Sequence, residues 1–356
     1  GQVSFTGPSV NLSLVDGQVH PLVLVDVSDR EEHRFVVDTG AAINVIDNDI
    51  AKRLGYEVIG TTEIGAPGGP RIAADIVHVP ELEIGELRIT DAKFVTMNLN
   101  EFSHGIMQGV LGLPLFQEYL LTFDKPNGEI RLSHASLSEQ DEHVVSYSDV
   151  DSHIQVTLDV AGRPVPTHID TGSMASFTLP IELMETLPTT KTMKESGNAA
   201  LVGGNRKISG ATLDGTIRFA GLAYQNPRLG FMDPSPGYGN LGNRILGELI
   251  VSVDQRKKLI SFQKPQQDPV ANTNSTRQLG LGIRGVPGGT TLAVTSVAPE
   301  SIAERAGFKV DDTLTSINGK LMSDYDMAEL GTLMKSTTPL VVGVERNGQT
   351  LTIEVP

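Results

Sequence analysis

Two copies of one tripeptide carry the side chains best suited to chemistry. Asp38-Thr39-Gly40 and Asp170-Thr171-Gly172 each end an apolar run, and the two aspartates stand 132 residues apart. Two carboxylates that share one site cannot both ionise easily, so one proton is held between them. The base of such a pair can deprotonate a water that attacks a peptide carbonyl, and the acid can protonate the departing nitrogen. The pattern predicts Asp38 and Asp170 as a catalytic pair.

The residues beside each aspartate suit this chemistry. Thr39 and Thr171 offer β-branched hydroxyls for a local hydrogen bond, and Gly40 and Gly172 permit a tight turn and close backbone approach. A surface turn after a strand would explain either tripeptide alone. Residue frequencies give one such tripeptide by chance in about one chain of this length in ten, and two in about one in several hundred. The pair therefore favours catalysis.

Other segments repeat in step with the tripeptides. Val110-Leu111-Gly112 is echoed by Ile245-Leu246-Gly247, which aligns Gly112 with Gly247. Further on, Leu121-Thr122-Phe123-Asp124 is echoed by Val251-Ser252-Val253-Asp254. The preserved order predicts a duplicated unit of about 130 residues.

Both halves consist of short β-forming runs bounded by turn residues, so we expect mainly β lobes. One short helix is expected after each tripeptide. The first covers 47–54, with Asp47 as its start signal and Gly55 as its stop; the second covers 180–187 and begins at Pro180.

The chain is long enough for several domains. A stretch rich in Pro, Gln and Asn precedes about 80 residues of strand-like and helix-like runs, which predict a small α+β domain with helices at 301–306 and 324–335. The expected organisation is lobe 1 at 1–134, lobe 2 at 135–264, a linker at 265–277 and the small domain at 278–356.

Composition excludes several classes of protein. Asp and Glu outnumber Lys and Arg by 43 to 28, and the net charge of -15 makes nucleic acids and anionic membranes poor partners. The absence of cysteine excludes disulfides, thiolate zinc sites and a cysteine nucleophile. The eight histidines lack paired helical spacing, so no metal site or cofactor is expected. No apolar run approaches the roughly 18 residues of a membrane span, so we expect no integral membrane segment.

The two tripeptides, continued by Ala41 and Ser173 and trailed by hydrophobic-hydrophobic-Gly elements, resemble the aspartic peptidases of the pepsin and retropepsin clan over roughly residues 1–264. The lobe length is closer to a duplicated retropepsin-like unit. The resemblance implies two β-lobes around a cleft, with Thr39 and Thr171 hydrogen-bonded across a pseudo-dyad and Ser173 supporting the second aspartate. It also implies glycine-rich flaps, for which the candidates are Gly65, Gly68, Gly69, Gly203 and Gly204. The first candidate flap departs from the pepsin pattern because it contains no tyrosine.

The last 80 or so residues resemble a PDZ domain of the kind attached to bacterial proteases. Gly280-Leu281-Gly282-Ile283 matches the carboxylate-binding loop, and 298–312 with Ile317-Asn318-Gly319 matches the middle of the domain. The resemblance implies that a protein C-terminus binds as an added strand bracketed by Leu281 and Ile283. This resemblance and the absence of cysteine favour the bacterial periplasm or cell envelope as the location, with the cytoplasm as the alternative. A chain that starts at Gly1 is compatible with the removal of an export signal.

These observations predict a mainly β, two-lobed aspartic-peptidase fold (retropepsin-like, duplicated) plus a small α+β PDZ domain. The expected function is an endopeptidase acting on polypeptide substrates, whose PDZ domain recruits protein C-termini or regulates access. The alternatives are a non-catalytic or latent peptide-binding protein that uses the same cleft, and a scaffold that holds two partners. A cleft too wide for the two carboxylates to meet would favour the scaffold.

Overall fold

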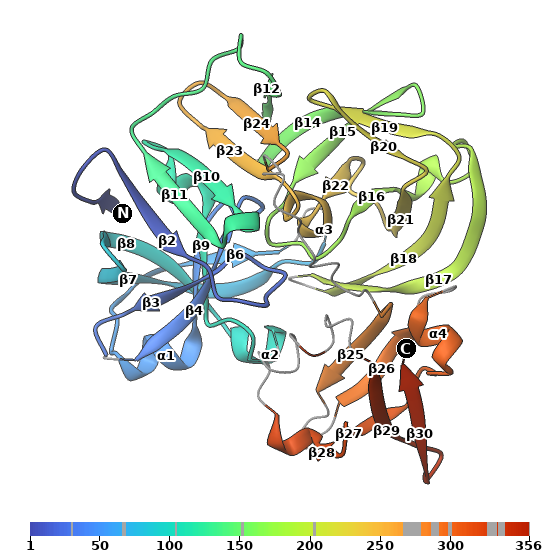
Figure 1. The fold of residues 1–356 in the computed structure, drawn as a ribbon. Helices are drawn as coiled ribbons and strands as arrows, with labels where there is room; N and C mark the ends of the chain where they lie inside the picture. The colour runs from blue at the N-terminus through green and yellow to red at the C-terminus, as the bar shows by residue number, and fades with distance from the viewer. Residues whose placement is uncertain are drawn as a thin grey trace. The chain divides into compact units, whose positions relative to one another are not determined.

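The chain is mainly β, as predicted (Figure 1). Its contacts divide it into two compact units, Gly1–Gln266 and Gln267–Pro356, which are described separately. The computed structural model describes residues 1–29, 31–65, 69–103, 105–150, 153–201, 204–265, 279–285, 292–297, 301–325, 333 and 339–355.

The first half of unit 1 forms a mixed sheet. Its strand order is β1 (Gln2–Ser4), β8 (Leu87–Met97), β5 (Asn44–Asp47), β9 (Gly109–Gly112), β4 (Glu32–Asp38), β3 (Leu22–Asp26), β7 (Ile72–Ile84) and β6 (Val58–Ile64). Strand β9 runs parallel to β4, and β3 pairs with the other side of β4 in the antiparallel sense. The strand that ends at Asp38 is therefore paired with a neighbouring strand on each side.

The second half repeats this arrangement. Its strand order is β17 (Thr189–Leu201), β18 (Gly204–Leu213), β21 (Arg228–Asp233), β16 (Phe177–Pro180), β22 (Gly239–Leu241), β15 (Arg163–Ile169), β14 (His153–Val160), β19 (Thr216–Phe219) and β20 (Leu222–Gln225), with β13 (Ser148–Val150) beside β14. Strand β22 runs parallel to β15, and β14 pairs antiparallel with its other side. Asp170 thus follows a strand held in the same way as β4.

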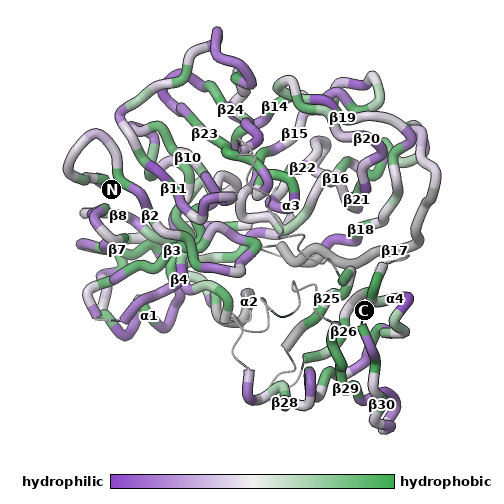
Figure 2. Tube along the Cα trace, in the orientation of Figure 1, coloured by the Kyte–Doolittle hydropathy of each residue, from purple (hydrophilic) through white to green (hydrophobic). Residues whose placement is uncertain are grey.

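A third sheet joins the two halves. Its strand order is β12 (Val144–Ser146), β24 (Leu259–Gln263), β23 (Ile250–Asp254), β10 (Leu120–Asp124), β11 (Glu129–Ser133) and β2 (Ser9–Ser13). The segments that echo each other in the sequence meet here: β10 and β23 pair antiparallel with Thr122 opposite Ser252, and their hydroxyls lie 2.9 Å apart. One continuous core of buried residues spans both halves. Hydrophobic residues predominate in strands such as β3, whereas the outer turns are largely hydrophilic (Figure 2).

The helices of unit 1 are short: α1 (Asn48–Arg53), α2 (Leu99–Ser103) and α3 (Asn243–Leu246). The helix predicted at 47–54 is α1, where the Asp47 side chain caps the start by accepting a hydrogen bond from the Asp49 N–H (2.9 Å) and Gly55 follows with a φ of +65°.

The helix predicted at 180–187 is wrong in kind and extent. The chain makes a 3-10 turn at Ile181–Leu183 and enters β17 at Thr189. Pro188 keeps any helix from continuing past Leu187, because a proline disfavours helical geometry at the residue before it and lacks the N–H that a further turn would need.

Unit 2 contains a sheet with the strand order β25 (Leu281–Gly285), β26 (Leu292–Val297), β27 (Thr313–Ile317), β29 (Leu340–Arg346) and β30 (Gln349–Val355), with β28 (Lys320–Leu321) beside β27. The helix predicted at 301–306 is α4 (Ile302–Ala306), capped by Ser301 and ended by Gly307 at a φ of +96°. Most of the helix predicted at 324–335 and of the linker predicted at 265–277 lies outside the described residues.

Candidate active site

The two aspartates stand at equivalent strand ends. Asp38 is the last residue of β4 and lies opposite Gly112 in the parallel pairing with β9. Asp170 follows β15, and its N–H donates to the carbonyl of Leu241 in the parallel strand β22 (3.0 Å). Phe35, Val37 and Ile169 in these strands are almost fully buried. Apolar burial therefore fixes the strands whose ends present the carboxylates.

The threonines tie the two strand ends together. The N–H of Thr39 donates to Oγ1 of Thr171, and the N–H of Thr171 donates to Oγ1 of Thr39, both at 3.0 Å. Each hydroxyl also donates across the halves, Thr39 to the carbonyl of Ile169 (2.7 Å) and Thr171 to that of Val37 (2.9 Å). Both threonines are buried. This closed set of bonds sets the separation of the two aspartates.

The glycines bring the carboxyl groups together. The N–H of Gly172 lies 3.0 Å from Oδ1 of Asp38 and 3.0 Å from Oδ1 of Asp170, so the two carboxyl groups share one donor. The N–H of Gly40 donates to Oδ1 of Asp38 (2.7 Å). A Cβ on Gly40 would lie 2.6 Å from Oδ1 of Asp170, and one on Gly172 would overlap the Asp38 carboxyl group. Only glycine allows this approach.

The environment favours a proton on Asp38. Burial and then the neighbouring charge of Asp170 raise the pKa of Asp38 to about 7, while the N–H groups of Gly40 and Gly172 act in the opposite direction. A half-buried carboxyl group with such a pKa stays protonated well above the range in which an exposed aspartic acid ionises. The arrangement can therefore hold one acid and one base at moderately acid pH.

Two side chains that no sequence pattern marks lie at this site. Asn240 in β22 donates from Nδ2 to Oδ2 of Asp170 (2.7 Å). His20 lies close to Asp170 and the backbone of Gly172; burial, followed by the charge of Lys125, lowers the pKa of His20, while Gly172 and Asp170 oppose that shift. Ser173 directly follows the second Asp-Thr-Gly tripeptide, and its hydroxyl accepts a hydrogen bond from the Ala175 N–H (3.2 Å).

The predicted equivalence of Gly112 with Gly247 is wrong, because Gly242 occupies the matching position. A Cβ on Gly112 would lie 2.8 Å from the carbonyl of Ala41, and one on Gly242 would lie 2.9 Å from that of Ser173. Gly247 instead follows α3. The true counterpart of Val110-Leu111-Gly112 is Asn240-Leu241-Gly242, which the polar Asn240 conceals in the sequence.

The flap candidates lie in or beside two hairpins. Gly65 and Gly69 lie between β6 and β7, whose last pair is Ile64 with Ile72. Gly204 begins β18 and pairs with Leu201 at the tip of the second hairpin. Gly68 and Gly203 lie outside the described residues.

In unit 2 the PDZ-loop candidates lie at a sheet edge. Gly280 has a φ of +72°, and Leu281-Gly282-Ile283 opens β25. Within the described ranges β25 pairs with β26 alone, so its other side is a free edge. Leu281 and Ile283 are partly buried against the core of unit 2.

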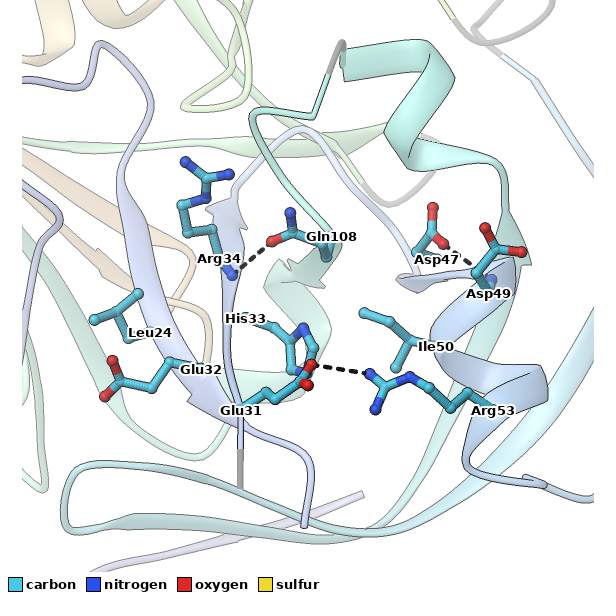
Figure 3. Close-up of a pocket in the computed structure, with 10 residues that line it drawn as sticks. All are labelled: Leu24, Glu31, Glu32, His33, Arg34, Asp47, Asp49, Ile50, Arg53 and Gln108. Carbon is cyan, nitrogen blue, oxygen red and sulfur yellow. Dashed lines mark hydrogen bonds and ion pairs between the residues drawn. The ribbon is translucent and has the colours of Figure 1, made fainter. Parts of the chain in front are cut away.

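A separate cavity lies at the start of β4, at the far end of that strand from Asp38 (Figure 3). Asp29, Glu31 and His33 beside it could offer ligand atoms to a metal ion. Their partners are protein groups: Arg53 lies 2.7 Å from Asp29 and 3.5 Å from Glu31, and His33 lies 2.9 Å from Asp29. Burial opposes the shift, but hydrogen bonds from His33, the Glu31 N–H and Arg53 lower the pKa of Asp29 to about 2. The cluster is thus explained as an ion-pair network.

Comparison with known families adds to this geometry. Residues 23–115 match the family model for an aspartyl protease. Residues 293–345 match the family model for a PDZ domain. The predicted combination of an aspartyl protease domain with a C-terminal PDZ domain is confirmed. A search of curated proteins finds no match. In the described part of the chain, no helix is both long and apolar enough to cross a membrane.

Proposed function

We propose that this protein is an aspartic endopeptidase in which Asp38 and Asp170 activate water. One observation carries the proposal: the Gly172 N–H lies 3.0 Å from a carboxyl oxygen of each aspartate. Two carboxyl groups that meet around one donor must share a proton, which is the arrangement that acid–base hydrolysis of an amide needs. The match of residues 23–115 to aspartyl proteases supports the same reading.

The reaction follows from the two protonation states. The carboxylate removes a proton from a bound water as the water oxygen attacks the peptide carbonyl carbon, while the carboxylic acid protonates the developing oxyanion. The tetrahedral species then loses its nitrogen, which takes a proton from the carboxyl group that received one in the first step, while one hydroxyl of the species returns its proton to the carboxylate that acted as the acid. The products are a free carboxyl group and a free amine, and the pair returns to its single shared proton.

The PDZ domain provides a second site for polypeptide. We propose that a protein C-terminus adds as a strand to the open edge of β25, where the backbone from Gly280 to Ile283 receives the terminal carboxylate. The domain would raise the local concentration of a substrate near the peptidase unit or regulate its access.

Hydrolysis of an unfolded protein and of a random peptide library from about pH 3 to 8 tests the proposal, since a coupled carboxyl pair changes protonation in this range. Wild type is compared with Asp38→Asn and Asp170→Asn, which keep the size of the side chain. Cleavage by wild type alone, with all three proteins folded, supports the dyad. Absence of cleavage by folded wild type, together with peptide affinity that depends on the PDZ loop, would favour a peptide-binding protein.

A further inference from the structure

The two halves of the site differ at one equivalent position. In each half, the residue two places before the catalytic aspartate pairs with a residue of the parallel neighbouring strand. Val36 lies opposite Val110 in the first half, and His168 lies opposite Asn240 in the second. Val110 and Asn240 are therefore structural counterparts. Val110 is apolar, whereas Asn240 places an amide beside Asp170.

The amide gives Asp170 a hydrogen bond that Asp38 lacks. Nδ2 of Asn240 donates to Oδ2 of Asp170 at 2.7 Å, while the other oxygen of Asp170 accepts from the Gly172 N–H. Oδ1 of Asp38 accepts two backbone N–H groups. Among the described residues, no side chain apart from Asp170 is hydrogen-bonded to the Asp38 carboxyl group.

The orientation of the amide indicates which aspartate carries the charge. An amide N–H donated to a carboxylate is a charge-assisted bond, which favours the ionised form of its acceptor. The opposite orientation would place the Asn240 oxygen against a carboxylate oxygen, and the two would repel. The buried Oδ1 of Asn240 has no hydrogen-bond partner in the described chain, so its orientation is set by Asp170.

We propose that Asn240 is a positioning residue that keeps Asp170 ionised and so places the shared proton on Asp38. Asp38 is then the acid of the first step, and Asp170 is the base that takes the proton of water. This assignment rests on the proposed peptidase function and deepens it by giving the two aspartates different roles. The burial and charge that hold the pKa of Asp38 near 7 agree with the assignment.

Other titratable groups act on Asp170 as well. Burial is the main cause of the lowered pKa of His20; the charge of Lys125 lowers this pKa further, and the charge of Asp170 raises it. His168 packs against His153 with ring centroids 4.8 Å apart; burial first, and then His153, lower the pKa of His168, against the influence of Asp170. A proton on His20 or His168 would also favour charge on Asp170. Substitution of Asn240 alone leaves all these groups in place, so it isolates the amide.

The test is a carboxyl ¹³C NMR titration of Asp38 and Asp170 in the full-length protein, together with the pH profile of kcat/KM. In wild type, Asp38 should be the last of the pair to ionise as the pH rises. Asn240→Val, which copies the first half, should move the titration of Asp170 to higher pH by about one to two units, the size expected for loss of a hydrogen bond to a charged group. The acid limb of kcat/KM should move by a similar amount.

The matched control is the exchange Val110→Asn with Asn240→Val, which should make Asp170 the last to ionise. If Asn240→Val does not fold, Asn240→Leu is a second variant of nearly the same size. Ionisation of Asp38 before Asp170 in wild type, or an unchanged Asp170 titration in a folded variant, would overturn the assignment. NMR observes the two carboxyl groups directly, independently of activity. If wild type shows the expected titration but cleaves no peptide, the peptidase function is rejected and the role of Asn240 stands.

Discussion

Thr39 and Thr171 each donate a backbone N–H to the hydroxyl of the other at 3.0 Å, which binds the two halves of the chain at the aspartates. Both side chains are buried, so water cannot replace a lost bond. We expect Thr39→Val to leave the Thr171 N–H and the Ile169 carbonyl unpaired and to lower the free energy of unfolding by about 2–4 kcal/mol. Urea denaturation measures this loss. Thr39→Ser keeps the hydroxyl and is the control; equal losses in both variants would contradict the role of the bonds.

The parts of the fold that could be predicted depend on local patterns. The strand before each aspartate is a short β-forming run, and α1 has both its cap at Asp47 and its stop at Gly55 within nine residues. The paired tripeptides placed Asp38 and Asp170 as a candidate pair because their repetition is visible in the sequence itself. These features need no knowledge of distant contacts.

The features that escaped prediction depend on register between distant strands. Asn240 reaches Asp170 because β22 pairs with β15. Sequence similarity to Val110-Leu111-Gly112 favours a different segment, which ends at Gly247 after α3. His20 lies beside Gly172, which is far away along the chain, and no local pattern marks that neighbour. The helix expected at 180–187 is wrong for a local reason: the chain makes only a 3-10 turn at Ile181–Leu183, and Pro188 prevents a longer helix from forming before β17.

Asp38 should make the stability of the fold fall as the pH rises. Its pKa is about 7 in the folded chain and near 3.8 when unfolded, so between these values the folded state holds a proton that the unfolded state has released. The contribution of Asp38 to the free energy of unfolding is fully present below about pH 4. It is lost progressively as the pH rises to 7, by at most about 4 kcal/mol. Thermal unfolding of wild type and Asp38→Asn across this range checks the sign. The advantage of Asp38→Asn over wild type should grow with pH; a constant difference would contradict a raised pKa.

Gly172 should tolerate no side chain. A Cβ there would overlap the carboxyl group of Asp38 and separate the two carboxyl groups that share the Gly172 N–H. Misplacing a catalytic group by about 1 Å can reduce a rate by roughly 100-fold, so we expect Gly172→Ala to lower kcat by at least about that factor. Peptide hydrolysis under single-turnover conditions measures the effect. Gly60→Ala in β6 is the control, because its Cβ would meet nothing closer than Ile76 Cδ1 at 3.8 Å. Equal activity in the two variants would argue against the close carboxyl pair.

The free edge of β25 predicts that the PDZ domain recognises a terminal carboxylate rather than an internal sequence. Backbone N–H groups near Gly280 would bond to the charged end, and a hydrogen bond to a charged group contributes about 1.5–3 kcal/mol. Amidation of the peptide C-terminus should therefore weaken binding by about 10-fold to 100-fold, measured by fluorescence anisotropy with the full-length protein. Gly280→Val supplies the protein-side control: a φ of +72° strains a β-branched residue, so the variant should lose the preference for the free carboxylate. Equal binding of the free and amidated peptides to wild type would place recognition elsewhere on the domain.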